Sequence, residues 1–135
     1  MMQIHKIRLL FVVTCCAGAL LQLPAAAQSV GPRTELKRVD LSGAPGMEVI
    51  TSVGEYKPGD EVPLHFHHGV ETGYVLQGAM VQMPGKEPST IATGATISNL
   101  RGVRHGGYKV IGETNLKLLT VHIVDKDRPL YDTSK

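Results

Sequence analysis

Hydrophobic and polar residues alternate along much of the chain after residue 30. Residues 47–56 read M-E-V-I-T-S-V-G-E-Y, and side chains at odd and even positions of such a segment leave opposite faces of an extended strand. Residues 116–124 form the longest apolar run. Glycine, proline and asparagine turns separate further short segments, and no 3.6-residue helical period is visible. The pattern predicts an all-β sandwich or barrel, with further strands over 35–41, 74–83, 89–92, 95–99 and 103–111.

The first 27 residues have the composition of an export signal. Lys6 and Arg8 supply positive charge, Leu9 to Leu23 is mostly apolar, and Ala25 to Ala27 has the A-x-A form of a cleavage site. A membrane anchor is the alternative, but the apolar run is short for a span and no basic cluster follows it. We therefore expect a cleaved signal peptide, a periplasmic or secreted protein, and no membrane anchor after cleavage.

Removing the signal changes both the charge and the cysteine count. Cys15 and Cys16, the two cysteines of the chain, lie in the signal, so the mature chain would have neither disulfides nor thiolate ligands. Loss of Lys6 and Arg8 leaves 14 − 2 = 12 basic against 12 acidic residues, a formal net charge of zero. A neutral chain without a basic stretch argues against a nucleic-acid partner.

The remaining 135 − 27 = 108 residues suffice for one domain. We expect a flexible leader over 28–34, a β-barrel over 35–125 and a polar C-terminal tail over 126–135.

Candidate metal ligands lie close together near the middle of the chain. His65 and His67 are one residue apart, so in a strand both imidazoles leave the same face while Phe66 turns away. A turn after His67, with Gly69 at positive φ, would bring Glu71 back beside them on a β-hairpin. Nitrogen and carboxylate ligands together suit a first-row divalent transition metal.

A fourth ligand is available from a second glycine-bounded strand pair, residues 94–105, which ends in His105. The two segments resemble the two motifs of the cupin superfamily, in particular its small single-domain exported bacterial members. Residues 59–78, with the spacing G-x5-H-x-H-x3-E-x6-G, match every fixed position of the first motif. Residues 94–109 match the second less closely, because Leu100 stands where the family usually has proline and Lys109 where it usually has asparagine.

The resemblance implies a double-stranded β-helix, or jelly roll. It also implies a homodimer and one divalent ion of iron, manganese, nickel, copper or zinc. Its implied ligands are His65, His67, Glu71 and His105. Four ligands leave two positions of an octahedral ion open for water, substrate or O₂. A metal-free member of the family, with these residues forming a polar cluster, is the alternative.

The leading functional hypothesis is a metal-dependent enzyme acting on a small polar or carboxylate molecule, because similar cupins include dioxygenases, decarboxylases, isomerases and lyases. The resemblance does not select among these reactions. The second hypothesis is a non-catalytic module that binds a small molecule or metal. Metal content together with an activity screen would separate the two.

Other polar residues have two interpretations each. His122 interrupts the apolar run 116–124 and is either a hydrogen-bonded core histidine or a partner and proton shuttle for the site. Arg101 and Arg104 flank His105 and either clamp a carboxylate substrate or lie in solvent. His68 is expected in a turn, with a role in the site as the alternative.

Overall fold

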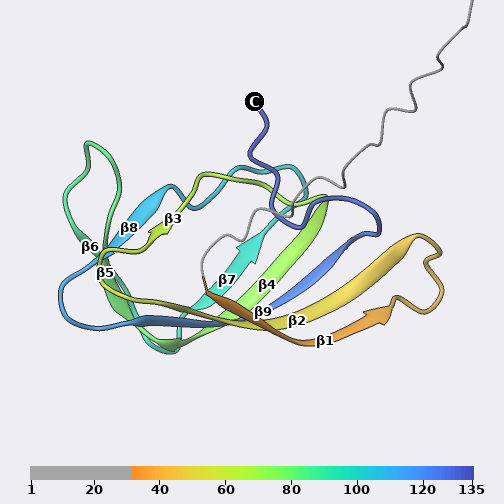
Figure 1. Ribbon diagram of the computed structural model, residues 1–135, viewed down its shortest axis with the longest axis horizontal. Helices are drawn as coiled ribbons and strands as arrows, with labels where there is room; N and C mark the ends of the chain where they lie inside the picture. Colours follow the sequence, from red (N-terminus) through yellow and green to blue (C-terminus); the bar gives the residue numbers. More distant parts are fainter. Residues whose placement is uncertain (1–31) are drawn as a thin grey trace, which may run out of the picture.

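The computed structural model describes residues 32–135, so the expected signal peptide and most of the expected leader lie outside the described residues. The described chain is all β, in two sheets that face each other (Figure 1). Among these residues there is no helix long and apolar enough to cross a membrane. The strands are β1 (Arg33–Asp40), β2 (Met47–Tyr56), β3 (Glu61–Val62), β4 (Gly69–Gln77), β5 (Ala79–Gln82), β6 (Ser89–Ile91), β7 (Thr96–Asn99), β8 (Tyr108–Ile111) and β9 (Leu116–Asp125).

One sheet has the strand order β1-β2-β9-β4-β7 and the other β3-β8-β5-β6. The two longest strands, β2 and β9, pair antiparallel along their whole length at the centre of the larger sheet. Their residues alternate strictly between buried and partly exposed, as the period-two pattern predicts. The prediction of an all-β double-stranded β-helix is confirmed.

The space between the sheets is apolar at one end and polar at the other. The apolar core comprises Tyr56, Val62, Val75, Ala79, Val81, Val110, Leu116 and Leu118. Further along the same inward faces, His122 of β9 lies beside Glu71 of β4, and Glu71 lies beside Asn99 of β7. The larger sheet therefore presents a row of three polar side chains to the interior, next to the hydrophobic core.

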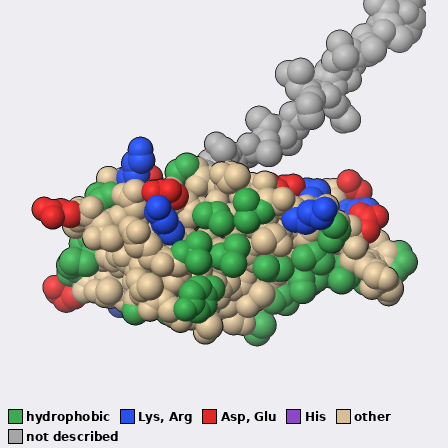
Figure 2. All heavy atoms as spheres, turned by 90° about the horizontal axis from the view of Figure 1, so that it is seen from below, with side chains coloured by type: hydrophobic (Ala, Val, Ile, Leu, Met, Phe, Trp, Pro, Cys, Tyr) green, Lys and Arg blue, Asp and Glu red, His purple; other side chains and the backbone are tan. Residues whose placement is uncertain are grey.

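The outward face of the larger sheet is unusually apolar. One cross-strand row across β1, β2, β9 and β4 consists of Val39, Val49, Ile123 and Val70. A second row, nearer the other end, contains Val53, Leu119 and Tyr74, of which Tyr74 is 47% exposed. Figure 2 shows the molecule from below relative to Figure 1, where β1, β2 and β9 lie. Hydrophobic side chains gather across the middle of this view.

The prediction that each metal motif forms a β-hairpin is wrong. β3 and β4 lie in different sheets, and β7 pairs with β4 whereas β8 pairs with β3 and β5. Each motif instead crosses from one sheet to the other, and the two crossings pair with one another. The His65 amide donates to the His105 carbonyl at 3.0 Å, and the His105 amide donates back at 2.8 Å.

Gly69 is not the turn residue that the sequence suggested. It lies at the start of β4 opposite Val124, outside the set of glycines with positive φ. A Cβ atom at this position would lie 2.0 Å from the carbonyl oxygen of Ile123. Glycine is therefore required here for the close approach of β4 to β9, which holds Glu71 beside His122.

Gly69→Ala should destabilise the fold by about 3 kcal/mol or more, because the methyl group would collide with the backbone of β9 and force the strands apart. Urea unfolding measures this loss. Gly85→Ala is the control: its methyl group meets nothing within 4 Å, and only its positive φ of 68° adds a cost of about 1 kcal/mol. Equal losses in the two variants would contradict the close-approach explanation.

Candidate metal centre

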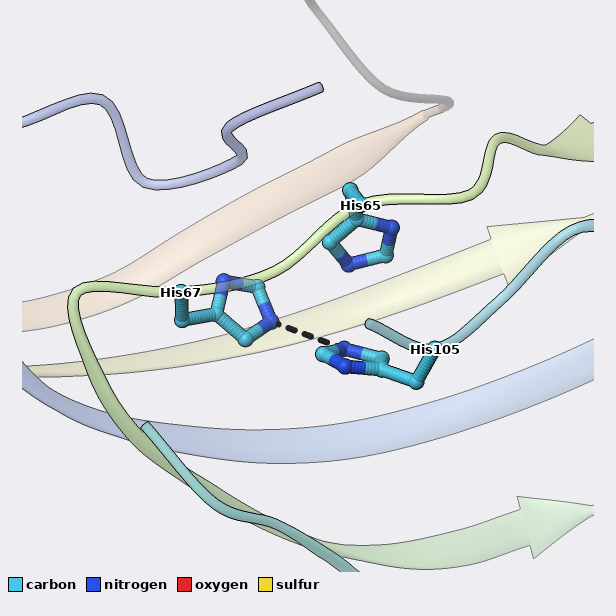
Figure 3. Close-up of side chains that lie close together, drawn as sticks. All are labelled: His65, His67 and His105. Atoms are coloured by element: carbon cyan, nitrogen blue, oxygen red, sulfur yellow. Dashed lines mark hydrogen bonds between the residues drawn. The ribbon is translucent and has the colours of Figure 1, made fainter. Parts of the chain in front are cut away.

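Three histidines from the two sheet crossings meet inside the barrel (Figure 3). The His65 ring centroid lies 4.9 Å from that of His67 and 4.3 Å from that of His105. The Nε2 atoms of His67 and His105 are 3.1 Å apart. His65 and His67 are almost completely buried, at 3% and 1% exposure. As predicted from their positions i and i+2, the imidazoles of His65 and His67 point to the same place. The segment that carries them crosses between the sheets, however, and is not a strand of a hairpin.

Backbone carbonyl groups orient all three rings in the same way. The Nδ1 atom of His65 lies 2.7 Å from the Pro63 carbonyl oxygen, and that of His105 lies 2.9 Å from the Val103 carbonyl oxygen. The Nδ1 atom of His67 contacts the Leu130 carbonyl oxygen. Because a carbonyl oxygen can only accept a hydrogen bond, each Nδ1 must carry the donated proton. In the neutral form each Nε2 is then left with a free lone pair, the state that binds a metal.

Glu71 of β4 brings a carboxylate to the same place. Its Oε2 atom lies 3.3 Å from Nε2 of His67 and 3.2 Å from Nε2 of His105. The Asn99 side-chain amide donates to the same oxygen at 2.6 Å. Burial alone would raise the pKa of Glu71, but its imidazole neighbours outweigh burial and hold the pKa far below its usual range. Glu71 is therefore a carboxylate at every physiological pH.

This arrangement crowds lone pairs together and requires a cation among them. Two Nε2 atoms and Oε2 of Glu71 lie 3.1–3.3 Å apart, and the hydrogen bonds to carbonyl groups leave no proton for the neutral rings to place between them. Either an imidazole takes up a second proton or a metal ion occupies the centre. Adjacent ligands of an octahedral ion with bonds of about 2.1 Å are separated by about 3.0 Å, so the observed spacing fits an ion.

The rings differ in how readily they accept that second proton. Burial lowers the pKa of His65 to about 4, so this ring is neutral near pH 7. Burial also opposes protonation of His105, but the interactions with Glu71 and with the Val103 carbonyl outweigh it, and its pKa is raised. In the metal-free protein His105 therefore competes for a proton, whereas His65 offers its lone pair.

His122 is a fourth nitrogen donor at the same site. It is fully buried, its ring centroid lies 4.6 Å from that of His67, and its Nε2 lies 3.3 Å from Oε1 of Glu71. That contact is at ion-pair distance, but neither ring nitrogen has a hydrogen-bond partner among the described residues. The interpretation as a hydrogen-bonded core histidine is therefore not met. Burying two ring nitrogens without hydrogen-bond partners costs free energy. This cost favours a role for His122 in the metal site, beside Glu71.

The C-terminal tail takes part in the site, which the sequence analysis missed. Asp132 and Phe66 exchange two backbone hydrogen bonds of 3.0 Å, which fix the tail to the ligand-bearing segment. The Tyr131 ring packs edge-on against His65, with centroids 4.7 Å apart, and the Leu130 carbonyl orients His67. An apolar Leu-Tyr pair within a polar tail was the available signal, but nothing local indicated where it would dock.

Three residues considered from the sequence bind elsewhere. Arg101 forms a bidentate pair with Asp125, at 2.7 and 2.9 Å. Arg104 donates to the Ser134 carbonyl at 2.5 Å, and it does not line the small cavity beside the histidines that is described below. His68 pairs with Asp132 at 2.9 Å and so holds the tail rather than lying free in a turn.

A small cavity adjoins the histidines. Its volume is about 50 Å³, and its polar lining includes Arg33, Tyr56, Asn99 and Tyr131 as well as His65, Glu71 and His105. A larger hollow, about 420 Å³, lies outside the barrel between β3, β5 and β8, and none of its lining residues is a histidine. The small cavity is the relevant one, because only it touches the donor atoms. Arg33 was not singled out from the sequence.

The cupin domain family matches residues 52–122, which span all five donor residues. The chain belongs to the cupin family. A double-stranded β-helix protein from Klebsiella pneumoniae is 15% identical, over 79% of this chain and 88% of that one, with a TM-score of 0.58. The polyketide cyclase RemF from Streptomyces resistomycificus is 23% identical over 69% and 75% of the two chains, with a TM-score of 0.49. A Bordetella pertussis cupin domain is 18% identical over 68% and 91%, with a TM-score of 0.47.

At these identities the likenesses show the cupin fold alone, and the Klebsiella structure carries that comparison. No curated protein is similar enough to match the chain. Two overlapping groups in this cupin could hold a metal ion, and His67 belongs to both: His65, His67 and His105, and His67, Glu71 and His122.

His122→Phe should weaken metal binding about 10- to 100-fold, because it removes the imidazole beside Glu71 while preserving bulk. Competition with a chromophoric chelator measures the affinity. Thr120→Val is the control, because Thr120 lies on the same inward face of β9 and lines the cavity without belonging to either donor group. Unchanged affinity in His122→Phe would show that this ring only fills space.

The metal-free protein should lose stability as the pH falls from about 6.5 toward 4. The folded state binds a proton at His65 only near pH 4, whereas the unfolded chain binds it near 6.5, so acid favours unfolding across that interval. Urea unfolding of chelator-treated protein at several pH values measures the slope. His65→Gln should show a shallower slope than the wild type, and identical slopes would contradict the assignment.

Proposed function

We propose that this cupin binds one first-row transition metal through His65, His67, Glu71 and His105, and uses it to act on a small molecule in the barrel cavity. Export by the predicted signal peptide would place the protein in the periplasm or outside the cell. His122, whose Nε2 lies 3.3 Å from Oε1 of Glu71, would lie beside the carboxylate rather than complete the ligand set.

One observation carries the proposal: the Nδ1 atoms of three imidazoles are hydrogen-bonded to backbone carbonyl oxygens. The three Nε2 lone pairs therefore remain free to bind a metal ion beside the Glu71 carboxylate. Hydrogen bonds of this kind on the second ring nitrogen are the usual companions of metal-bound histidine. A purely structural polar cluster would instead use these nitrogens as mutual donors and acceptors. While both rings are neutral with Nδ1 protonated, the two Nε2 atoms 3.1 Å apart have no proton to share.

A bound ion of this type supplies Lewis acidity or, for a redox metal, a centre for oxygen chemistry. The protein's own residues would bind, orient and desolvate the substrate. Tyr131 covers His65 and His67 from the tail side and would exclude water from the site. Thr120 and Asn99 contribute polar groups to the cavity wall, where they can orient a small polar ligand.

A binding module without turnover is the second candidate. The specific observation in its favour is the size of the cavity, about 50 Å³, which leaves little room for a substrate together with a second reactant. A redox metal whose absorption changes with both substrate and O₂ would favour the enzyme. Tight binding of a small molecule with no chemical change in it would favour the module.

His65→Ala should remove most of the bound metal and leave the barrel folded, because His65 lies in a sheet crossing rather than in the apolar core. Elemental analysis of purified protein gives the metal content, and circular dichroism tests the fold. His68→Ala is the matched control: it removes an imidazole three residues along the chain that faces Asp132 instead of the centre, and should keep its metal. Full metal occupancy in His65→Ala would contradict the proposal.

We also propose that a second copy of the chain covers the outward apolar face of the larger sheet. Val39, Val49 and Ile123 form one row of that face, and Val70 beside them is 37% exposed. Contiguous apolar surface of this kind is uncommon on a monomer and marks an interaction site. A face made of parallel apolar rows can pack against its own symmetry copy in a two-fold dimer.

Light scattering should give twice the mass of one chain, and Leu119→Glu should reduce it to that of one chain, because the carboxylate would be buried unpaired at the centre of the face. Leu100→Glu is the control, since Leu100 is 61% exposed and lies outside the strands. A monomeric wild-type protein would overturn the dimer without affecting the metal site.

A further inference from the structure

We propose that Arg33 and the metal centre form a two-point binding site for a short-chain carboxylate anion, so that Arg33 determines which substrates enter. The inference rests on the proposed metal site and names the class of ligand that the site takes. Arg33, rather than Arg101 or Arg104, would then be the residue that clamps a carboxylate.

Arg33 is the one side chain with a permanent positive charge in the lining of the cavity. It begins β1, pairs across the sheet with Gly54 of β2, and is four-fifths buried, with a side-chain exposure of 20%. Gly54 lines the same cavity, and a Cβ atom at this position would lie 2.9 Å from the Tyr56 ring. The guanidinium carbon lies 5.9 Å from the centroid of the Tyr131 ring, which itself packs on His65. Arg33 and the histidines His65 and His105 therefore line one small cavity, together with the Tyr131 ring that contacts both Arg33 and His65.

The hydrogen-bonding capacity of Arg33 is largely unused within residues 32–135. Its Nη1 atom donates to the Ser52 hydroxyl at 2.5 Å. The nearest carboxylate, Glu35, lies 3.9 Å from Nη2, which is beyond hydrogen-bond distance. A guanidinium has five N–H donors in a planar fork that matches a carboxylate. The remaining donors are available to a ligand in the cavity.

The charge of the cavity also calls for an anion. Glu71 is the acidic residue of the lining, so a divalent ion with neutral imidazoles leaves the centre at 2 − 1 = +1, and Arg33 raises the sum to +2. Burying such charge without a counter-ion is unfavourable. A carboxylate anion that binds the open side of the metal with one end and Arg33 with the other would contact both positive groups and lower this sum to 2 − 1 = +1.

The cavity volume limits the size of that anion. At about 10–15 Å³ for each water-sized position, a volume of about 50 Å³ corresponds to roughly four such positions. Acids of two or three carbons fit this space, whereas aromatic acids do not.

The test uses the protein without the predicted signal peptide, loaded with Co²⁺, and its metal content is measured first. Two probes of equal size are compared: glycolate, which is an anion, and glycolamide, which is neutral. Calorimetry and the visible absorption of Co²⁺ report binding. We expect glycolate to bind at least 10-fold more tightly than glycolamide. Arg33→Met should weaken glycolate binding about 10- to 100-fold and leave glycolamide unchanged, because a charge-assisted pair is lost.

Arg101→Met is the control variant, because Arg101 is engaged by Asp125 outside the cavity, and it should bind both probes like the wild type. Equal affinity for the two probes, or a glycolate preference that survives in Arg33→Met, would overturn the inference. The comparison of probes on the wild type holds even if Arg33→Met fails to fold. Failure of the wild type to load Co²⁺ would instead refute the metal site itself, so the two failures are distinguishable.

Discussion

The site depends on three backbone carbonyl groups that fix which nitrogen of each imidazole carries the proton. Pro63, Val103 and Leu130 provide them, from three separate segments of the chain. Once their Nδ1 atoms donate outward, the neutral rings present lone pairs inward, beside the Glu71 carboxylate. Such a centre is unfavourable alone, because it gathers acceptors without donors, and it becomes favourable when a cation enters. The surrounding fold holds these acceptor atoms close together although the neutral rings provide no hydrogen-bond donor between them.

The two sheets contribute different parts of this centre. The crossings that carry His65 and His105 pair with each other, so the two motifs form one unit. The larger sheet supplies Glu71 and His122 from neighbouring strands, whose close approach requires a glycine at position 69. The barrel interior is thereby divided into an apolar end that stabilises the fold and a polar end that contains the candidate metal ligands.

Much of this could be predicted from sequence because the signals were local. Alternation in residues 47–56 and 116–124 indicated the strands, and the spacing of His65, His67 and Glu71 indicated residues that the structure brings close together. Strand pairing could not be predicted, since crossings and hairpins have the same turn residues. The inward face of β2 was also hidden, because Ser52 and Gly54 point inward while Val49 and Val53 point outward. Arg33 and Tyr131 reach the site only through contacts with residues distant in the chain.

X-ray absorption spectroscopy of the metal-loaded protein tests the central claim most directly, because scattering from the metal reports the number of imidazole rings bound to it. The account predicts nitrogen and oxygen ligands at about 2.0–2.2 Å, with outer-shell scattering from three imidazoles. A metal surrounded by oxygen atoms alone, without imidazole scattering, would contradict it.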